Sequence, residues 1–337
     1  MVNTVLCPIC LHEFEWSEDE LFERTSAGEY RALDLADETG PRRADLLRAA
    51  HVRCPASAGQ ATEHHLPHAY VRHGQPLVIG LVGGPQTGKT HLLAAMIWAI
   101  ERNGLSSYGL TASAVDIERH QNYLDTYVHP LMIDRKALSR TPQQDLAEFA
   151  DALLISDGEH TTAVAFFDIA GESLRSTTAE ATRFLPAVGG LLFVVDPSED
   201  PNTVGDRSFG AVLDRLPRSG GRLEVPAAVV VTKCDMLRLQ SPVDEWLYAS
   251  GDGLDPAAIL AESRDVYAFL HKRKAQPWLS PYDKCRRCTL HFASATGGAA
   301  ASDGRFLREV RPRRVLEPLA ALLAMTNVMS GGQEVGI

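Results

Sequence analysis

Long hydrophobic runs are missing from this sequence of 337 residues. The longest apolar stretches, 92–100 and 187–195, fall well short of the roughly 20 residues that a membrane-spanning helix needs. Residues 1–7 carry no basic segment ahead of an apolar core, so we expect no secretory signal. Internal repeats and low-complexity tracts are absent as well. These absences exclude the membrane-spanning and fibrous classes and predict a cytoplasmic globular protein without a membrane partner.

An excess of positive charge is also missing. The chain has 33 lysines and arginines against 43 aspartates and glutamates, a formal net charge of −10. An acidic chain lacks the electrostatic footprint of a general nucleic-acid binder, so we expect no nucleic-acid partner. We expect the two basic runs, 272–274 and Arg311, Arg313 and Arg314, to lie on a solvated surface.

Cysteine is sparse, with 6 residues in the whole chain. So few cysteines in so long a chain do not make a disulfide framework. Four of them form two Cys-x-x-Cys pairs, a spacing that in a cytosolic protein indicates metal or redox chemistry.

Residues 1–75 differ in texture from the rest of the chain. Ser17 and Glu20 have the spacing of a capping box, which predicts a helix start in the charged stretch 17–50. The histidine- and proline-rich stretch 64–76 favours a linker. We therefore predict that 1–75 is a zinc-ribbon-like segment with a helical insertion and a linker.

From Leu77 the pattern is that of an α/β domain. Short apolar runs at 77–82, 163–167, 191–195, 227–231 and, more weakly, 289–293 alternate with helix-length segments such as 91–101. Strands that are apolar on both faces indicate a mostly parallel sheet covered by helices on both sides. The stretch 314–325 fits a closing helix. We predict one P-loop NTPase domain over 76–330, with an insertion at about 106–157.

A phosphate-binding loop follows the first of these strands. The pattern G-x-x-x-x-G-K-[ST] is matched in full, between a strand and a helix, by Gly83, Gly84, Pro85, Gln86, Thr87, Gly88, Lys89 and Thr90. Glycines let successive N–H groups converge on phosphate oxygens, and the helix N-terminus adds partial positive charge. We expect Lys89 to reach the β- and γ-phosphates and the Thr90 hydroxyl to bind Mg²⁺.

Three later segments favour guanine over adenine. Asp168 to Gly171 resembles the D-x-x-G segment of GTPases, in which Asp holds a Mg²⁺-bound water and the Gly N–H senses the γ-phosphate. Residues Thr232, Lys233 and Asp235 fit the [NT]-K-x-D guanine motif. A third segment, Ser294, Ala295 and Thr296, resembles the S-A-x motif that offers a backbone N–H to guanine O6. All three follow strand ends at one sheet edge, where ligands bind in such folds; ordinary strand-end turns in a P-loop ATPase or kinase are the alternative.

The resemblance extends to the N-terminal segment. A Cys-Pro-x-Cys at 7–10, an Arg-Cys-Pro at 53–55 and a His-Leu-Pro at 65–67 precede the phosphate loop. From Cys7 to about Ala300 the chain resembles the bacterial double-GTPase family, found in predicted multi-gene signalling or conflict systems. That resemblance implies a TRAFAC-like GTPase domain behind a small zinc ribbon, with GTP and GDP as ligands.

Hydrolysis of GTP requires Mg²⁺, a positioned water and stabilisation of the transferred phosphoryl group. We expect the switch-I threonine in the insertion and choose Thr141, beside which Arg140 is either an internal arginine finger or a surface residue. Glu172 follows Gly171 where Ras-like enzymes carry a water-orienting Gln. A carboxylate there is unfavourable near the γ-phosphate, which predicts a slow switch and a Glu172→Gln variant at least as fast.

The first cysteine pair predicts a zinc site. Cys7 and Cys10 have the knuckle spacing of a zinc ribbon, and Cys54 is the third ligand. Because position 57 is Ser57, a poor ligand, we choose His51 as the fourth, with His64 and His65 as alternatives and a metal-free pair as the competing interpretation. We expect such a ribbon to contact protein rather than DNA.

The second pair, Cys285 and Cys288, has His291 three residues on but no evident fourth ligand. A metal site, a redox pair and two incidental or redox-sensitive thiols remain open, and the last is favoured. Cys234 is expected to pack as a small hydrophobe.

The sequence thus predicts a Mg²⁺-dependent GTPase switch with a protein partner, for example a second GTPase. An ATP-binding P-loop NTPase or kinase and a non-catalytic nucleotide-binding scaffold are the alternatives.

Overall fold

The computed structural model describes residues 3–10, 12–25, 28–55, 64–139, 147–170, 185, 187–198, 206–249 and 253–336. Its centre is a seven-stranded sheet. The strand order is β15 (Cys288–Phe292), β14 (Ala227–Val231), β11 (Gly190–Val195), β7 (Leu77–Gly83), β10 (Thr161–Ala170), β9 (Ala147–Ser156) and β8 (Thr111–Ala114). The strands predicted from the apolar runs are all present.

The five strands from β15 to β10 are parallel. At one side of the sheet β9 pairs antiparallel with β10, and β8 pairs antiparallel with β9. After β7 the chain first forms β8 and β9 at the far side of the sheet. It then forms β10 on one side of β7 and β11 on the other. The strand order therefore reverses at β7, and in folds of this type ligands bind at the carboxyl ends of the strands beside such a switch point.

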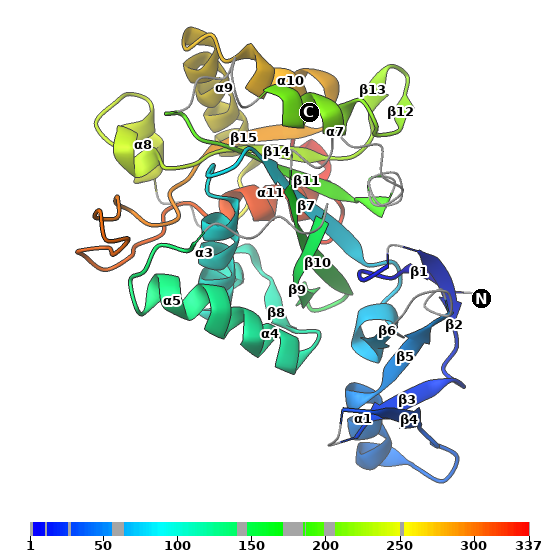
Figure 1. Ribbon diagram of the computed structural model, residues 1–337. Coiled ribbons are helices and arrows are strands. Elements are labelled where there is room, and N and C mark those ends of the chain that lie inside the picture. Colours follow the sequence, from blue (N-terminus) through cyan, green and yellow to red (C-terminus); the bar gives the residue numbers. More distant parts are fainter. Residues whose placement is uncertain are drawn as a thin grey trace.

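Both faces of this sheet are buried. In β7, Val78 and Val82 face one core, and Ile79 and Leu81 face the other, so an unbroken apolar run still alternates between two layers. The first core is closed by α7 (Asp206–Leu213), α9 (Pro256–Lys272) and α10 (Gln276–Lys284). The second is closed by α3 (Lys89–Glu101) and α11 (Glu317–Met325), and Figure 1 shows the two layers on opposite sides of the strands. The predicted α/β sheet with helices on both faces, and its closing helix, are confirmed.

The predicted insertion at 106–157 contributes two strands, β8 and β9, to the central sheet. Between them lies a short helical layer next to α3. It comprises α4 (Ile117–Tyr123), the π-helical turn η3 (Leu124–Val128) and α5 (His129–Met132). The 3₁₀ turn η2 (Gly104–Tyr108) lies before β8.

The N-terminal part is built mainly of strands. A hairpin of β1 (Asn3–Leu6) and β2 (Glu13–Trp16) precedes a four-stranded antiparallel sheet. That sheet has the order β4 (Tyr30–Ala32), β3 (Leu21–Arg24), β5 (His51–Cys54) and β6 (His64–Pro67), with α1 (Gly40–Ala49) and α2 (His68–Val71) beside it.

Two predictions for this part were wrong. Ser17 does not start a helix, because its hydroxyl accepts from the Asp19 N–H in a turn (3.1 Å) and β3 follows. Residues 64–71 are not a linker, because Leu66 and Tyr70 are buried in the core that also covers the central sheet. Helix α2 contacts β9 and β10, so the N-terminal part packs against the central sheet at these two strands (Figure 1).

Shorter elements complete the described structure. They are β12 (Arg218–Ser219), β13 (Arg222–Leu223), η6 (Cys234–Leu237), α8 (Val243–Leu247) and η7 (Gly332–Glu334). Within the ranges given above, no helix has the length and apolar character needed to cross a bilayer.

Candidate functional site

The phosphate-loop sequence forms the turn between β7 and α3 at the switch point of the sheet. Gln86 and Gly88 adopt positive φ angles of 63° and 93°, which curl the backbone. At Gly83 a side chain would stand 2.7 Å from the Val194 carbonyl oxygen of β11, so the tight turn requires glycine there. The N-terminus of α3, with its partial positive charge, therefore points into the loop.

The loop holds its own lysine in place. Lys89 Nζ donates to the carbonyl oxygens of Gly83 (3.0 Å) and Gly84 (3.3 Å) and lies 3.7 Å from Asp168 Oδ1. Its side chain is only 12% exposed. A largely buried ammonium group held against this glycine-containing loop fits an anion such as phosphate.

Two side chains with oxygen donors meet beside the lysine. Thr90 Oγ1 at the start of α3 donates to Asp168 Oδ2 near the end of β10 at 3.0 Å. A hydroxyl and a carboxylate are the hard oxygen donors that Mg²⁺ takes in phosphate sites. These two residues fit the predicted ion, and they meet because α3 follows β7, the parallel neighbour of β10.

The predicted base-recognition segment is joined directly to the phosphate loop. Thr232, which follows β14, places its Oγ1 2.7 Å from the Thr87 carbonyl oxygen and 2.8 Å from that of Val195. Thr232 is 2% exposed and Thr87 is 3% exposed. This buried contact fixes the position of the T-K-x-D segment relative to the phosphate loop.

The next residues orient a buried carboxylate. Lys233 has a positive φ of 52°, and a 3₁₀ turn, η6, follows it. Asp235 in this turn is 5% exposed and accepts a hydrogen bond from Ser294 Oγ, which in turn accepts from the Gly297 N–H (2.9 Å). The ends of β14 and β15 thus bring Asp235 and the predicted S-A-T segment together, and Ala295 is buried beside them.

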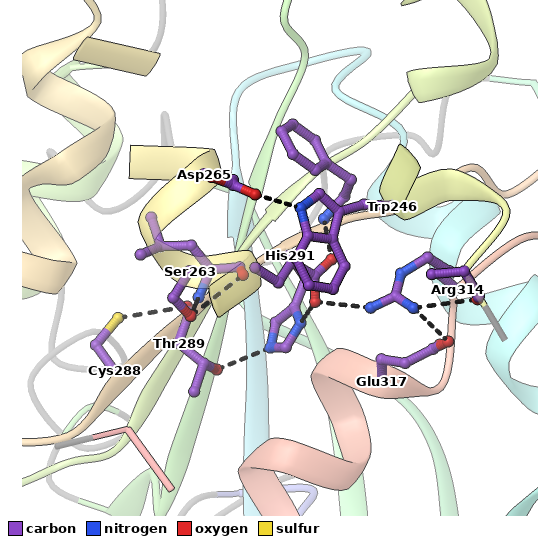
Figure 2. A network of polar contacts seen from close by, with 12 residues as sticks. Trp246, Ser263, Asp265, Cys288, Thr289, His291, Arg314 and Glu317 are labelled. Carbon is purple, nitrogen blue, oxygen red and sulfur yellow. Dashed lines mark hydrogen bonds and ion pairs between the residues drawn. The ribbon is translucent and has the colours of Figure 1, made fainter. Parts of the chain in front are cut away.

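A network of polar contacts, which includes His291 and Arg314 (Figure 2), is connected through the backbone to the S-A-T segment. Ser294 and Arg313 exchange both backbone hydrogen bonds, at 2.9 and 2.8 Å. The adjacent Arg314 donates to Glu262 Oε2 of α9 (2.7 Å), which lies 2.9 Å from His291 Nδ1 of β15. Burial raises the pKa of Glu262, but His291 and Arg314 outweigh it and bring that pKa below its usual range.

This network overturns the expectation that Arg314 is solvated, and it also bears on the metal-site alternative for Cys285, Cys288 and His291. Arg314 is not on a solvated surface, because its side chain is 9% exposed and lies between Glu262 and Glu317. His291 is fully buried, with Thr289 Oγ1 2.9 Å from its other ring nitrogen. Its ring is therefore held by Glu262 and Thr289, and among the described residues it joins no metal-binding group with Cys285 and Cys288.

The second cysteine pair lies in an environment that suppresses thiolate chemistry. Burial raises the pKa of Cys285 to about 12 and that of Cys288 well above its ordinary value. Since the thiolate is the nucleophile in redox reactions, both thiols are in the unreactive form at neutral pH. Cys234 is fully buried too, and its Sγ donates to the Val231 carbonyl oxygen.

A second polar cluster lies in the N-terminal part. The ligand atoms of Cys7, Cys10, Cys54 and His64 all lie within 4.8 Å of one another, and all four residues are buried. Cys10 Sγ and Cys54 Sγ are 3.6 Å apart, close to the roughly 3.8 Å between two sulfurs of a tetrahedral zinc site. Burial raises the pKa of Cys7 and lowers that of His64, so His64 is neutral and available as a ligand.

The fourth member of this cluster is His64 and not the predicted His51. Side chains alternate between the faces of a strand, so His51 and Cys54 on β5, three residues apart, point to opposite sides. His51 lies against the ring of Tyr30, with centroids 5.1 Å apart. His64 is the direct cross-strand neighbour of Cys54. The other alternative, His65, stacks on Tyr30 (3.9 Å).

Some predicted residues lie outside the part of the chain that the structure describes. These are Arg140, Thr141, Gly171 and Glu172.

Two described residues at the site were missed by sequence reasoning. Asp196, at the end of β11, is 2% exposed and forms an ion pair with Lys233. His91 of α3 is half-buried and its Nε2 accepts from the Leu138 N–H (3.2 Å); burial and the nearby Lys233 lower its pKa to about 4, so it stays neutral. An aspartate that directly follows a buried strand was a usable signal for the first. Only the packing of α3 reveals the second.

The comparisons with known proteins agree with this geometry. A family model described as Double-GTPase 2 matches residues 77–269, which is more than half of the chain. The matched range contains the phosphate loop, Asp168 and the T-K-x-D segment. A comparison with curated proteins finds no match.

Proposed function

The chain belongs to the Double-GTPase 2 family, and we propose that it is a Mg²⁺-dependent GTPase that works as a nucleotide-dependent switch on a protein partner. The family supports a GTP-binding P-loop protein. The observation that best supports guanine recognition is the Thr232–Thr87 contact. It fixes the T-K-x-D segment, which carries the buried carboxylate of Asp235, next to the phosphate loop. We take residues 76–330 as the GTPase domain and 1–75 as a metal-binding segment packed against it.

Each residue has a role in this proposal. Backbone amides 83–90 and Lys89 would hold the phosphates, and Asp235 would accept hydrogen bonds from guanine N1–H and its exocyclic amine, which adenine does not supply. Ser294 orients Asp235, and the backbone at 294–296 would face guanine O6. Thr90 and Asp168 would hold Mg²⁺, which when bound would neutralise charge on the β- and γ-phosphates.

The rate and the switching role rest on the sequence. Glu172 stands after the D-x-x-G segment, and a carboxylate there supports slow turnover that a partner accelerates. Thr141 and Gly171 would sense the γ-phosphate, and ordering of such segments by nucleotide is how GTPase switches transmit their state. A second GTPase is the partner class that we propose.

The N-terminal cluster supports a structural zinc site. Three thiolates and a neutral imidazole are a common ligand set for structural zinc. Cys7, Cys10, Cys54 and His64 would hold the ion, and their burial leaves no open position for catalysis. We propose that this segment presents a surface to the partner.

Calorimetric titration with GTP, GDP and ATP, with and without Mg²⁺, tests the nucleotide assignment. We expect ATP to bind at least about 100-fold more weakly than GTP, because each hydrogen bond to a charged acceptor contributes about 1.5–3 kcal/mol. Equal binding of ATP would favour the ATP-dependent NTPase. Phosphate release from GTP separates the enzyme from a non-catalytic scaffold, which would bind GTP without turnover.

A further inference from the structure

A cavity of about 190 Å³ opens beside the predicted Mg²⁺ ligands. Thr90 of α3 and Asp168 of β10 form one wall, and α4, η3 and β9 supply the others. Its volume leaves room for several water molecules, since one water takes about 30 Å³. Its further lining residues are Leu93, Arg119, Asn122, Tyr123, Thr126, Tyr127, Phe149 and Ala150.

Arg119 is the one cationic residue among these lining residues. Its guanidinium carbon lies 4.8 Å from the centroid of the Phe149 ring, a cation–π contact. Phe149 is the cross-strand partner of Phe167, the residue before Asp168, and the two rings pack at 5.4 Å. The guanidinium is therefore held beside the strand end that carries the predicted Mg²⁺ ligand.

The backbone around Arg119 also fixes its position. The Asp116 side chain caps α4 by accepting from the Arg119 N–H at 3.0 Å. The neighbouring Glu118 is engaged by Arg24. Among the described residues, no carboxylate is paired with the Arg119 guanidinium, so its charge remains available to a ligand in the cavity. The π-helical turn η3 completes the wall, and such turns are frequent at functional sites.

We propose that Arg119 is a catalytic residue that stabilises the transferred phosphoryl group during GTP hydrolysis, an inference that rests on the proposed function. In this reaction a bond forms between a water oxygen and the γ-phosphorus, and the bond from that phosphorus to the β,γ-bridging oxygen breaks. The proton lost by the water ends on the phosphate product, and GDP leaves with the bridging oxygen. Lys89 lies on the phosphate-loop side of Asp168, and Arg119 supplies a second cation from the insertion side.

The test is single-turnover phosphate release from GTP and Mg²⁺ by the full chain. We expect Arg119→Ala to slow release at least tenfold and up to about 10³-fold, the lower range for an arginine that stabilises this transition state. Affinity for GDP should change less than about threefold, because the interaction forms with the transferred group. Arg119→Lys should recover part of the rate.

Arg102→Ala is the matched control, because Arg102 stacks on Trp98 (5.2 Å) in the same way but does not line the cavity. Its rate should equal that of the unmodified chain. Binding of GDP with aluminium fluoride, a transition-state mimic, should weaken at least tenfold in Arg119→Ala, and Arg119→Lys should retain part of it.

The two possible failures are distinct. If the unmodified chain hydrolyses GTP and Arg119→Ala does so at the same rate, Arg119 has no catalytic role and the proposed function stands. If the unmodified chain binds no guanine nucleotide, the proposed function and this inference are both overturned.

Discussion

The nucleotide site and the N-terminal cluster both gather polar side chains from distant parts of the chain, but they are held together differently. Thr90, Asp168, Thr232 and Asp235 lie at the edge of a sheet that is buried on both faces. Cys7, Cys10, Cys54 and His64 join a two-stranded hairpin to a small four-stranded sheet. Buried contacts within the protein hold the nucleotide site together, whereas we expect the cluster to depend on a bound metal ion.

Metal removal gives the largest expected effect. Binding free energies of structural zinc are about 10–16 kcal/mol, comparable to the whole stability of a domain. After chelation we expect proteolysis within residues 1–75, while 76–330 stays protected and still binds GDP. Zinc uptake should weaken as pH falls, because the ion displaces protons from thiols whose pKa is raised at Cys7. An equally resistant N-terminal part after chelation would contradict the comparison.

The next effect concerns the sheet edge. Lys89→Ala removes an ammonium group held on the loop, so we expect GTP and GDP affinity to fall at least about 100-fold, with folding intact. Titration calorimetry and a thermal midpoint measure the two quantities. Lys136→Ala, at an exposed ion pair with Asp134, is the control and should bind as the unmodified chain does. Loss of folding together with binding would show that this edge is not preorganised.

Separate replacement of the two candidate histidine ligands by alanine sharpens the comparison within the cluster. His64→Ala should reduce zinc affinity at least about 10-fold, because it removes one of four ligands. His51→Ala should leave zinc content unchanged, since His51 packs on Tyr30. Zinc quantitation in the two purified variants decides the matter. Normal zinc in His64→Ala with loss in His51→Ala would reverse the assignment.

The smallest expected effect lies between the two regions. Arg24 of β3 forms an ion pair with Glu118 of α4, and both side chains are largely solvated, at 40% and 72% exposure. Arg24→Ala should therefore change the free energy of unfolding by less than about 1 kcal/mol. Denaturant titration measures this. A larger loss would mean that the two regions stabilise each other through this pair.

The sequence predicts the central sheet well because β7, β11 and β14, and the central part of β10, are unbroken apolar runs. The phosphate loop, Thr232 and Asp235 follow such strands, so their convergence at one edge can be inferred from the order of motifs along the chain. The edge strand β8 and its neighbour β9 could not be found in this way. Asp151 interrupts the apolar pattern of β9. Its carboxylate is buried, and the contact with His120 Nδ1 at 2.6 Å compensates for that burial.

The N-terminal Cys/His cluster shows a second limit of sequence-based prediction. Spacing along the chain favours His51, but strand alternation and pairing decide which side chain meets Cys54, and both depend on tertiary structure. Arg314 and Arg119 are further examples. Nothing in a basic run distinguishes a solvated arginine from one paired with a buried glutamate, and only the fold brings Arg119 to the cavity that Asp168 also lines.

The most direct test of the central claim, that Asp235 recognises guanine at a phosphate loop, is titration of Asp235→Asn with GTP and XTP. Xanthine has a carbonyl where guanine has its amine, so an Asn amide can donate to it. We expect GTP affinity to fall at least about tenfold and XTP affinity to rise, since each mismatched hydrogen bond costs about 1–3 kcal/mol. Unchanged GTP affinity with no gain for XTP would contradict the account.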